Sequence, residues 1–134
     1  MDAAVTAFAK YGMEGTAISQ ITSIAEVANG TFYYHFRDKT ELVDSVAHAI
    51  AASLVDQVDN AISGVTHGAE RVALATQYFI RLAAADPEWG RLVAEAMTNT
   101  GSFRKQISRG IRKDIAIGIE QGHFDVELTE LLLT

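Results

Sequence analysis

Residues 29–39 concentrate side chains that can contact nucleic acid. They carry amide, hydroxyl, imidazole or amine groups: Asn29, Thr31, Tyr33, Tyr34, His35 and, just beyond, Lys39. Such groups hydrogen-bond to base edges or to phosphate oxygens. Gly30 removes a side chain in their midst, so the backbone there can come close to a partner. The stretch therefore predicts a surface that binds nucleic acid.

Two short helices must position these groups. We expect the first after Thr16, which would be its cap, and the second over residues 27–34, with a tight turn near Ala25-Glu26 between them. Apolar residues at helical spacing give the pair an inner side: Phe8, Ile18, Ile21, Val27, Phe32 and Phe36. This order is typical of a helix–turn–helix unit, whose second helix lies in the major groove of DNA.

The segment resembles the tetracycline-repressor (TetR) family of one-component transcriptional regulators. The resemblance is closest at GTFYYHF, residues 30–36, and at KTEL, residues 39–42. It extends back through Thr16 and Gly12 to Asp2. The family implies a DNA-binding head of three helices, a helical body for effector binding and dimerisation, and regulation of transcription, more often repression.

The resemblance also implies roles for individual residues. Base contacts are implied for Ala28, Asn29, Gly30 and Thr31. Phosphate contacts are implied for Thr16, Tyr33, Tyr34, His35 and Lys39. Asn29 could form paired hydrogen bonds with adenine, and the Thr31 methyl could touch a thymine methyl. Three alternatives remain open: Tyr33 as a buried tyrosine, His35 as a local cap, and Lys39 as an ordinary solvated lysine.

Glu26 departs from the family pattern, which usually has glycine at this point of the turn. A left-handed conformation at Glu26 would cost about 1–2 kcal/mol relative to glycine. We therefore expect the turn to be reshaped. Ala17 also replaces a frequent hydroxyl residue, which removes one candidate phosphate contact.

Composition restricts the function classes. The 134 residues carry a net charge of −6, which argues against non-specific binding to nucleic acid through a broad basic surface. The absence of cysteine excludes disulfides, a thiol nucleophile and a Cys-ligated zinc site. No apolar run approaches the roughly 20 residues that span a bilayer. We expect a cytoplasmic protein with no membrane partner.

The rest of the chain also predicts helices, so we expect an all-α fold. A long helix should start at the cap Asp38, followed by helices over about 68–84, from Asp86-Pro87 onward, and over about 102–121. We expect a DNA-binding domain over 1–38 and an effector-binding and dimerisation domain over 39–134. Family ligand domains are longer and Leu128–Leu133 resembles an unfinished helix, so we expect this second domain to be incomplete and truncated at its C-terminus.

An effector would need a cavity among the later helices. The candidates for its lining are Tyr78, Phe79, Trp89, Met97 and Phe103, and plain core packing is the alternative for each. Few charges lie among them, which favours a largely apolar small molecule. Four cations share one face of the last helix, Lys105, Arg109, Arg112 and Lys113, which predicts a solvated face or, alternatively, an anionic ligand or acidic neighbour.

Catalysis finds little support in the sequence, and a small hydrolase would need a deep cleft that holds a carboxylate–histidine pair. The four histidines show no His-x-x-x-His pair, and there is no phosphate-binding glycine loop or nucleophile elbow. We expect no enzyme, no metal and no cofactor other than an unknown effector. The main hypothesis is a ligand-responsive repressor that binds a palindromic double-stranded DNA operator as a homodimer. The alternative is a helical domain for small molecules or protein interaction, with weak or no DNA binding.

Overall fold

The structure is a computed structural model that describes residues 1–126. Over that range the chain forms seven α-helices and no strand: α1 (Asp2–Tyr11), α2 (Ile18–Ile24), α3 (Asn29–His35), α4 (Lys39–Ala61), α5 (Gly68–Ala85), α6 (Pro87–Asn99) and α7 (Gly101–Glu120). The expectation of an all-α fold is confirmed. The predicted helix at Leu128–Leu133 lies outside the described residues.

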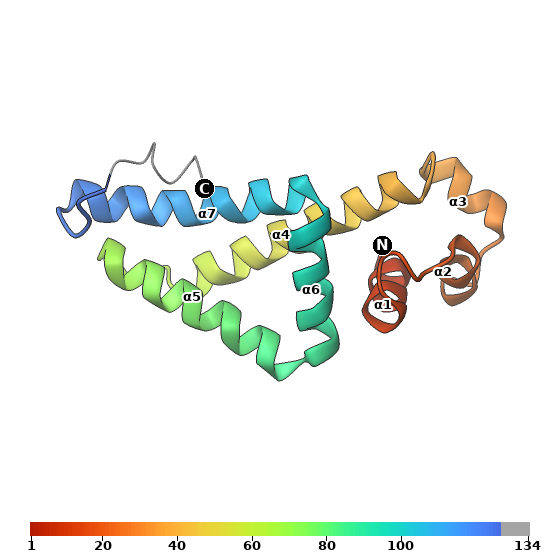
Figure 1. Ribbon diagram of the computed structural model, residues 1–134, viewed down its shortest axis with the longest axis horizontal. Helices are drawn as coiled ribbons and strands as arrows, with labels where there is room; N and C mark the ends of the chain where they lie inside the picture. The colour runs from red at the N-terminus through yellow and green to blue at the C-terminus, as the bar shows by residue number, and fades with distance from the viewer. Residues whose placement is uncertain (127–134) are drawn as a thin grey trace.

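The helices form an elongated molecule with two ends (Figure 1). Helices α1–α3 gather at one end, which we call the head, and α4 leads from it into a body made with α5, α6 and α7. Within the body, α7 packs along both α4 and α5. Helix α6 also packs against α1, so the head touches the body at a second place besides its connection through α4. The predicted boundary between residues 38 and 39 coincides with the start of α4 and stays a prediction.

Side-chain caps fix the starts of two helices as predicted. Asp38 Oδ1 accepts from the Glu41 amide at 2.9 Å and begins α4. Asp86 accepts from the amides of Glu88 and Trp89 at 3.1 Å each, with Pro87 at the first helical position of α6. These caps decide where the chain leaves the head and where it turns within the body.

The core is continuous from head to body. It is built mainly from alanine and branched or aromatic side chains, and its fully buried large members are Phe8, Leu42, Val46, Leu54, Leu92 and Phe103. In the head, Phe8, Ile21 and Phe32 are buried as expected, with Ile18 and Phe36 packed against them. The prediction for Val27 was wrong: it is 43% exposed, because α3 begins at Asn29 and Val27 lies in the connecting turn.

Within residues 1–126, no helix is long and apolar enough to cross a membrane.

Candidate nucleic-acid interface and body cavity

One buried aromatic side chain anchors α3, and the other residues of this helix are exposed to solvent. Phe32 is 5% exposed and packs against Phe36 with ring centroids 5.7 Å apart. The other residues of the helix and its cap are exposed: Ala28, Asn29, Gly30, Thr31, Tyr33, Tyr34 and His35. We call these seven residues the recognition face. Because α3 has so little inward surface, nearly all of it is available to a partner.

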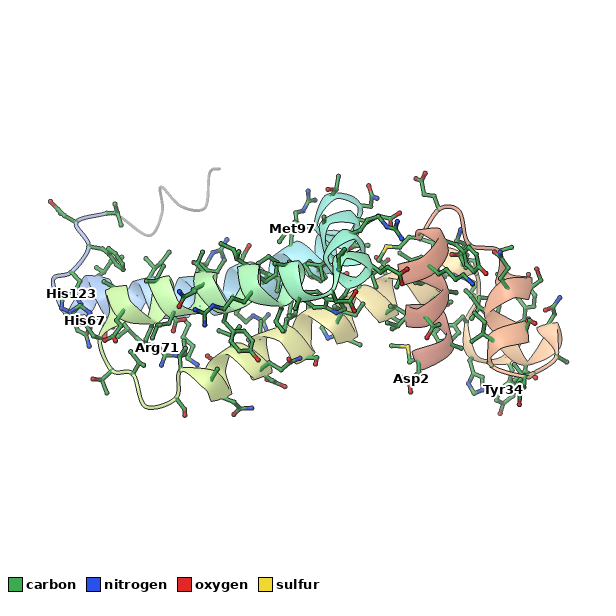
Figure 2. All side chains as sticks on the ribbon, turned by 90° about the horizontal axis from the view of Figure 1, so that it is seen from below. Asp2, Tyr34, His67, Arg71, Met97 and His123 are labelled. Atoms are coloured by element: carbon green, nitrogen blue, oxygen red, sulfur yellow. The ribbon has the colours of Figure 1, made fainter. Side chains whose placement is uncertain are left out.

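The tyrosines of the recognition face are open to solvent. Tyr34 is 86% exposed and Tyr33 is 60% exposed, so the alternative of a buried Tyr33 is wrong. In Figure 2, Tyr34 lies at the head end of the molecule, far from the body. His35 stacks edge-on against Tyr34, with ring centroids 5.1 Å apart. No cap is made by a side chain at the start of α3.

Asn29 is held from behind by α2. The buried Thr22 hydroxyl donates to Asn29 Oδ1 at 2.6 Å, and Thr22 is only 4% exposed. This bond leaves the Asn29 amide nitrogen free to donate outward, as a contact to a base acceptor requires. A paired contact to adenine would have Oδ1 accept a second hydrogen bond beside the one from Thr22. This positioning bond could not be predicted from the sequence, since the two residues belong to different helices.

The turn between α2 and α3 is not reshaped, which corrects the expectation for Glu26. Its φ is 56°, the left-handed conformation that usually selects glycine. Two hydrogen bonds close the end of α2 around it: Val27 N donates to Thr22 O at 3.0 Å, and Glu26 N to Ser23 O at 3.2 Å. This is the Schellman pattern, and it satisfies carbonyls that would otherwise lack a partner. These bonds offset the conformational cost.

Thr16 is not available as a phosphate ligand, nor does it cap α2. It is 1% exposed, and its hydroxyl lies 2.6 Å from the Gly12 carbonyl oxygen, to which it donates. Ala17 caps α2 instead, and its amide donates to Gln20 Oε1 at 2.8 Å. A hydroxyl residue before an apolar helix can cap that helix or can turn inward and donate to a nearby carbonyl, and the sequence alone does not distinguish the two.

Two cations lie at the end of the recognition face. Lys39 is half-buried, and its Nζ donates to the Glu14 carbonyl at 2.9 Å, which leaves two ammonium N–H groups for a phosphate. The side chain of Arg37, which the sequence analysis did not select, is 82% exposed. Its Nε lies 3.5 Å from Asp38 Oδ2, so a carboxylate partly offsets its charge.

A cavity of about 240 Å³ lies in the body between α4, α5, α6 and α7. Phe79 and Met97 line it, as expected. Tyr78, Trp89 and Phe103 do not, and Phe103 is fully buried in the core. The lining residues that were not predicted include five aliphatic residues of α4 and α7: Leu54, Val55, Val58, Ile107 and Ile111. Helical spacing could not separate these side chains from ordinary core.

A buried ion pair lies beside this cavity, and one of its members, Asp114, lines it. Arg71 Nε donates to Asp114 Oδ1 at 2.7 Å, and both side chains are less than 10% exposed. Figure 2 shows Arg71 in the part of the body that lies away from the head. Asp114 shares the apolar face of α7 with Ile107 and Ile111, and a lone carboxylate on such a face is the signal that the sequence offered. The cationic face of α7 is exposed, and Lys113 pairs with Asp59 at 3.0 Å.

Helix α6 joins the cavity to the head. Met97 lines the cavity from this helix, while Glu95 Oε1 accepts from the Met13 amide at 3.0 Å. One turn earlier, Arg91 donates to the carbonyl oxygen of Ala9 in α1. A displacement of α6 would therefore act directly on α1.

Comparison with known proteins identifies the head. The family model for bacterial regulatory proteins of the tetR family matches residues 1–46. The head belongs to the TetR family. The expected resemblance is thereby confirmed, and α2 and α3, the expected helix–turn–helix, lie within the matched residues.

The curated relatives of the chain are transcriptional regulators from bacteria. The uncharacterized HTH-type transcriptional regulator YvdT of Bacillus subtilis is 30% identical over 64 residues, which are 48% of this chain and 33% of that protein. The fatty acid metabolism regulator protein of the same species is 28% identical over 86 residues, which are 64% of this chain and 44% of that protein. The matches thus cover less than half of either relative.

Solved structures extend the likeness to the body. The transcriptional regulator FadR from Bacillus subtilis, in complex with stearoyl-CoA, has a TM-score of 0.74 at 22% identity, covering 96% of this chain and 74% of that one. RolR without ligand has a TM-score of 0.72 at 27% identity, covering 94% and 68%. Head and body together therefore have the fold of these regulators.

Proposed function

We propose that this protein is a ligand-responsive transcriptional repressor that binds a palindromic DNA operator as a homodimer in the cytoplasm. The observation that carries the proposal is the recognition face: seven consecutive residues apart from Phe32, all exposed on a TetR-type helix–turn–helix. Two such heads would enter successive major grooves if their recognition helices lay about 34–36 Å apart. Ala28–Thr31 would read bases, while Tyr33, Tyr34, His35 and Lys39 would hold phosphates.

The effector would act by changing the population of head positions. The cavity and the contacts to the head share helix α6, through Met97 on one side and Glu95 and Arg91 on the other. A ligand that binds one position of α6 better shifts the equilibrium by the difference between its two affinities. The structure of FadR with stearoyl-CoA supports a small-molecule effector with an apolar part.

The proposal is tested by DNA binding at several salt concentrations. A duplex selected from a random-sequence pool should bind, and its affinity should fall steeply with salt because phosphate contacts release counterions. Lys39→Ala should weaken binding to every duplex alike and reduce the salt slope by about one unit. The control is Lys105→Ala, which removes an exposed positive charge from α7 in the body and should leave DNA binding unchanged.

Selection that enriches no duplex, even in dilute buffer, would contradict DNA binding and favour a helical domain for ligand or protein interaction. Equal effects of the two lysine substitutions would show that DNA is attracted by the overall charge of the protein and is not bound at the recognition face.

A further inference from the structure

Asn29, the first residue of α3, lies against a buried threonine of α2. The left-handed turn at Glu26 folds the chain back, so that Thr22 bonds to two later residues. Its carbonyl oxygen accepts from the Val27 amide at 3.0 Å, and its hydroxyl donates to Asn29 Oδ1 at 2.6 Å. Thr22 is 4% exposed, whereas Asn29 is exposed. One end of the Asn29 amide group is therefore held by the protein, and the rest of the side chain is open to a partner.

The short distance indicates which end of the amide group points inward. O–H···O bonds are roughly 2.5–3.0 Å long, whereas N–H···O bonds are roughly 2.7–3.2 Å long. The 2.6 Å from Thr22 Oγ1 to Asn29 Oδ1 suits a hydroxyl donor and an oxygen acceptor, and is short for an amide nitrogen. The Ser19 carbonyl oxygen, also within reach of this hydroxyl, lies farther away at 3.2 Å. A threonine hydroxyl has a single proton, and the closer oxygen of Asn29 takes it.

The part of Asn29 that a base can meet is therefore its amide nitrogen, which only donates. In the major groove, guanine presents two acceptors, N7 and O6, whereas adenine presents the acceptor N7 beside the donor N6. A paired contact to adenine needs the same Asn29 oxygen that Thr22 already holds. A contact to guanine leaves that oxygen with Thr22.

We propose that Thr22 is a positioning residue that fixes Asn29 as a hydrogen-bond donor, so that the protein prefers guanine to adenine at the base pair that Asn29 contacts. The inference rests on the proposed function, because it needs the recognition face to lie in the major groove. Thr22 is buried behind Asn29 and does not itself touch DNA. It determines which base is read and leaves the phosphate contacts unchanged.

Thr22→Val tests the inference, because valine has nearly the shape of threonine but lacks the hydroxyl. The position to measure is the base pair at which Asn29→Ala loses discrimination. There the unsubstituted protein should bind guanine about tenfold more tightly than adenine, as expected for one specific base contact. Thr22→Val should reduce this ratio about fivefold, which corresponds to the loss of one hydrogen bond. The salt slope of binding should stay the same, because no phosphate contact is lost.

Three further variants separate positioning from stability. Thr16→Val also removes a buried hydroxyl from the head, but this hydroxyl donates to the Gly12 carbonyl oxygen, so the ratio should not change. Thr22→Ser keeps the hydroxyl and should keep the ratio. In the Asn29→Ala background, Thr22→Val should leave the base preference unaltered, because the side chain that Thr22 positions is gone.

NMR of the free protein tests the orientation of the amide group without DNA. The side-chain amide protons of Asn29 should show no strong nuclear Overhauser effect to the Thr22 Hβ proton, because the Asn29 oxygen faces Thr22. A strong effect would place the amide nitrogen against Thr22 and overturn the inference. A preference for adenine, or an unchanged ratio in Thr22→Val, would also overturn it. Failure to bind any duplex would instead refute the proposed function, and the NMR result would still decide the orientation.

Discussion

Glu26 shows how far a single residue can depart from a family pattern without changing the fold. It adopts a φ of 56° where glycine is usual, and two backbone hydrogen bonds around it keep the turn in place. Thr16 shows the converse, because a residue type that suits a helix cap or a phosphate is turned inward to the Gly12 carbonyl. The sequence shows that Glu26 and Thr16 are unusual or polar at these positions, but the neighbouring backbone determines their conformation and their hydrogen bonds.

The left-handed conformation of Glu26 predicts the relative stability of two variants. Glu26→Gly should be more stable than Glu26→Ala by about 1 kcal/mol, because both remove the charge but only glycine removes the left-handed penalty. Urea unfolding of the two variants measures the difference. Equal stability of the glycine and alanine variants would mean that φ at this position carries no strain.

At the scale of elements, the sequence predicted the helices better than their contacts. The caps Asp38 and Asp86 appear where expected, since capping depends on residues close in sequence. The cavity lining was predicted only for Phe79 and Met97, because which apolar residues surround a void depends on how α4, α5 and α7 cross. The buried pair of Arg71 and Asp114, 43 residues apart, was missed for the same reason.

Replacing Gly110 of helix α7 by alanine should stabilise the fold. A Cβ at Gly110 would lie 3.5 Å from both Val55 methyl carbons, an ordinary contact. Gly110→Ala should therefore raise the free energy of unfolding by about 0.5–1 kcal/mol, because alanine is the better helix former. Gly90→Ala in α6 is the contrasting variant: its Cβ would lie 2.7 Å from the Ala83 carbonyl oxygen, so it should destabilise. Thermal unfolding of both measures the signs, and the same sign for both would contradict the packing described.

Removing Arg71 should loosen three helices at once. Arg71→Met leaves Asp114 buried without its partner, which should cost about 3–5 kcal/mol of unfolding free energy. Arg81→Met, on the exposed side of the same helix α5, serves as control and should change stability by less than about 0.5 kcal/mol. Chemical denaturation distinguishes them. A small loss for Arg71→Met would show that the ion pair adds little to the body.

At the scale of the whole molecule, α6 connects the two ends. Arg91 bonds to Ala9 in α1, Glu95 bonds to Met13 just after α1, and Met97 of the same helix reaches the cavity. The sequence indicated a head and a body but not this second junction, because the bonding residues lie 82 positions apart. The junction gives the body a way to influence the head besides the long helix α4.

Glu95 tests that junction. Glu95→Ala removes the acceptor of the Met13 amide, so this amide should exchange with solvent about tenfold faster, in line with the loss of one hydrogen bond to a charged group. Glu95→Gln keeps a carbonyl acceptor and should retain most of the protection. Hydrogen exchange followed by NMR measures both. Unchanged exchange in Glu95→Ala would show that Glu95 of α6 does not hold the segment after α1.

The central claim is that the recognition face reads DNA, and Asn29 tests it most directly. The measurement is the affinity of wild-type and Asn29→Ala protein for a selected duplex and for each of its single base-pair substitutions. We predict that Asn29→Ala loses about 1–3 kcal/mol at one base position in each half-site and no longer discriminates there, while discrimination elsewhere is retained. A variant that keeps the wild-type preference at every position would contradict the account, because the most exposed helix of the head would then not be the one that reads the sequence.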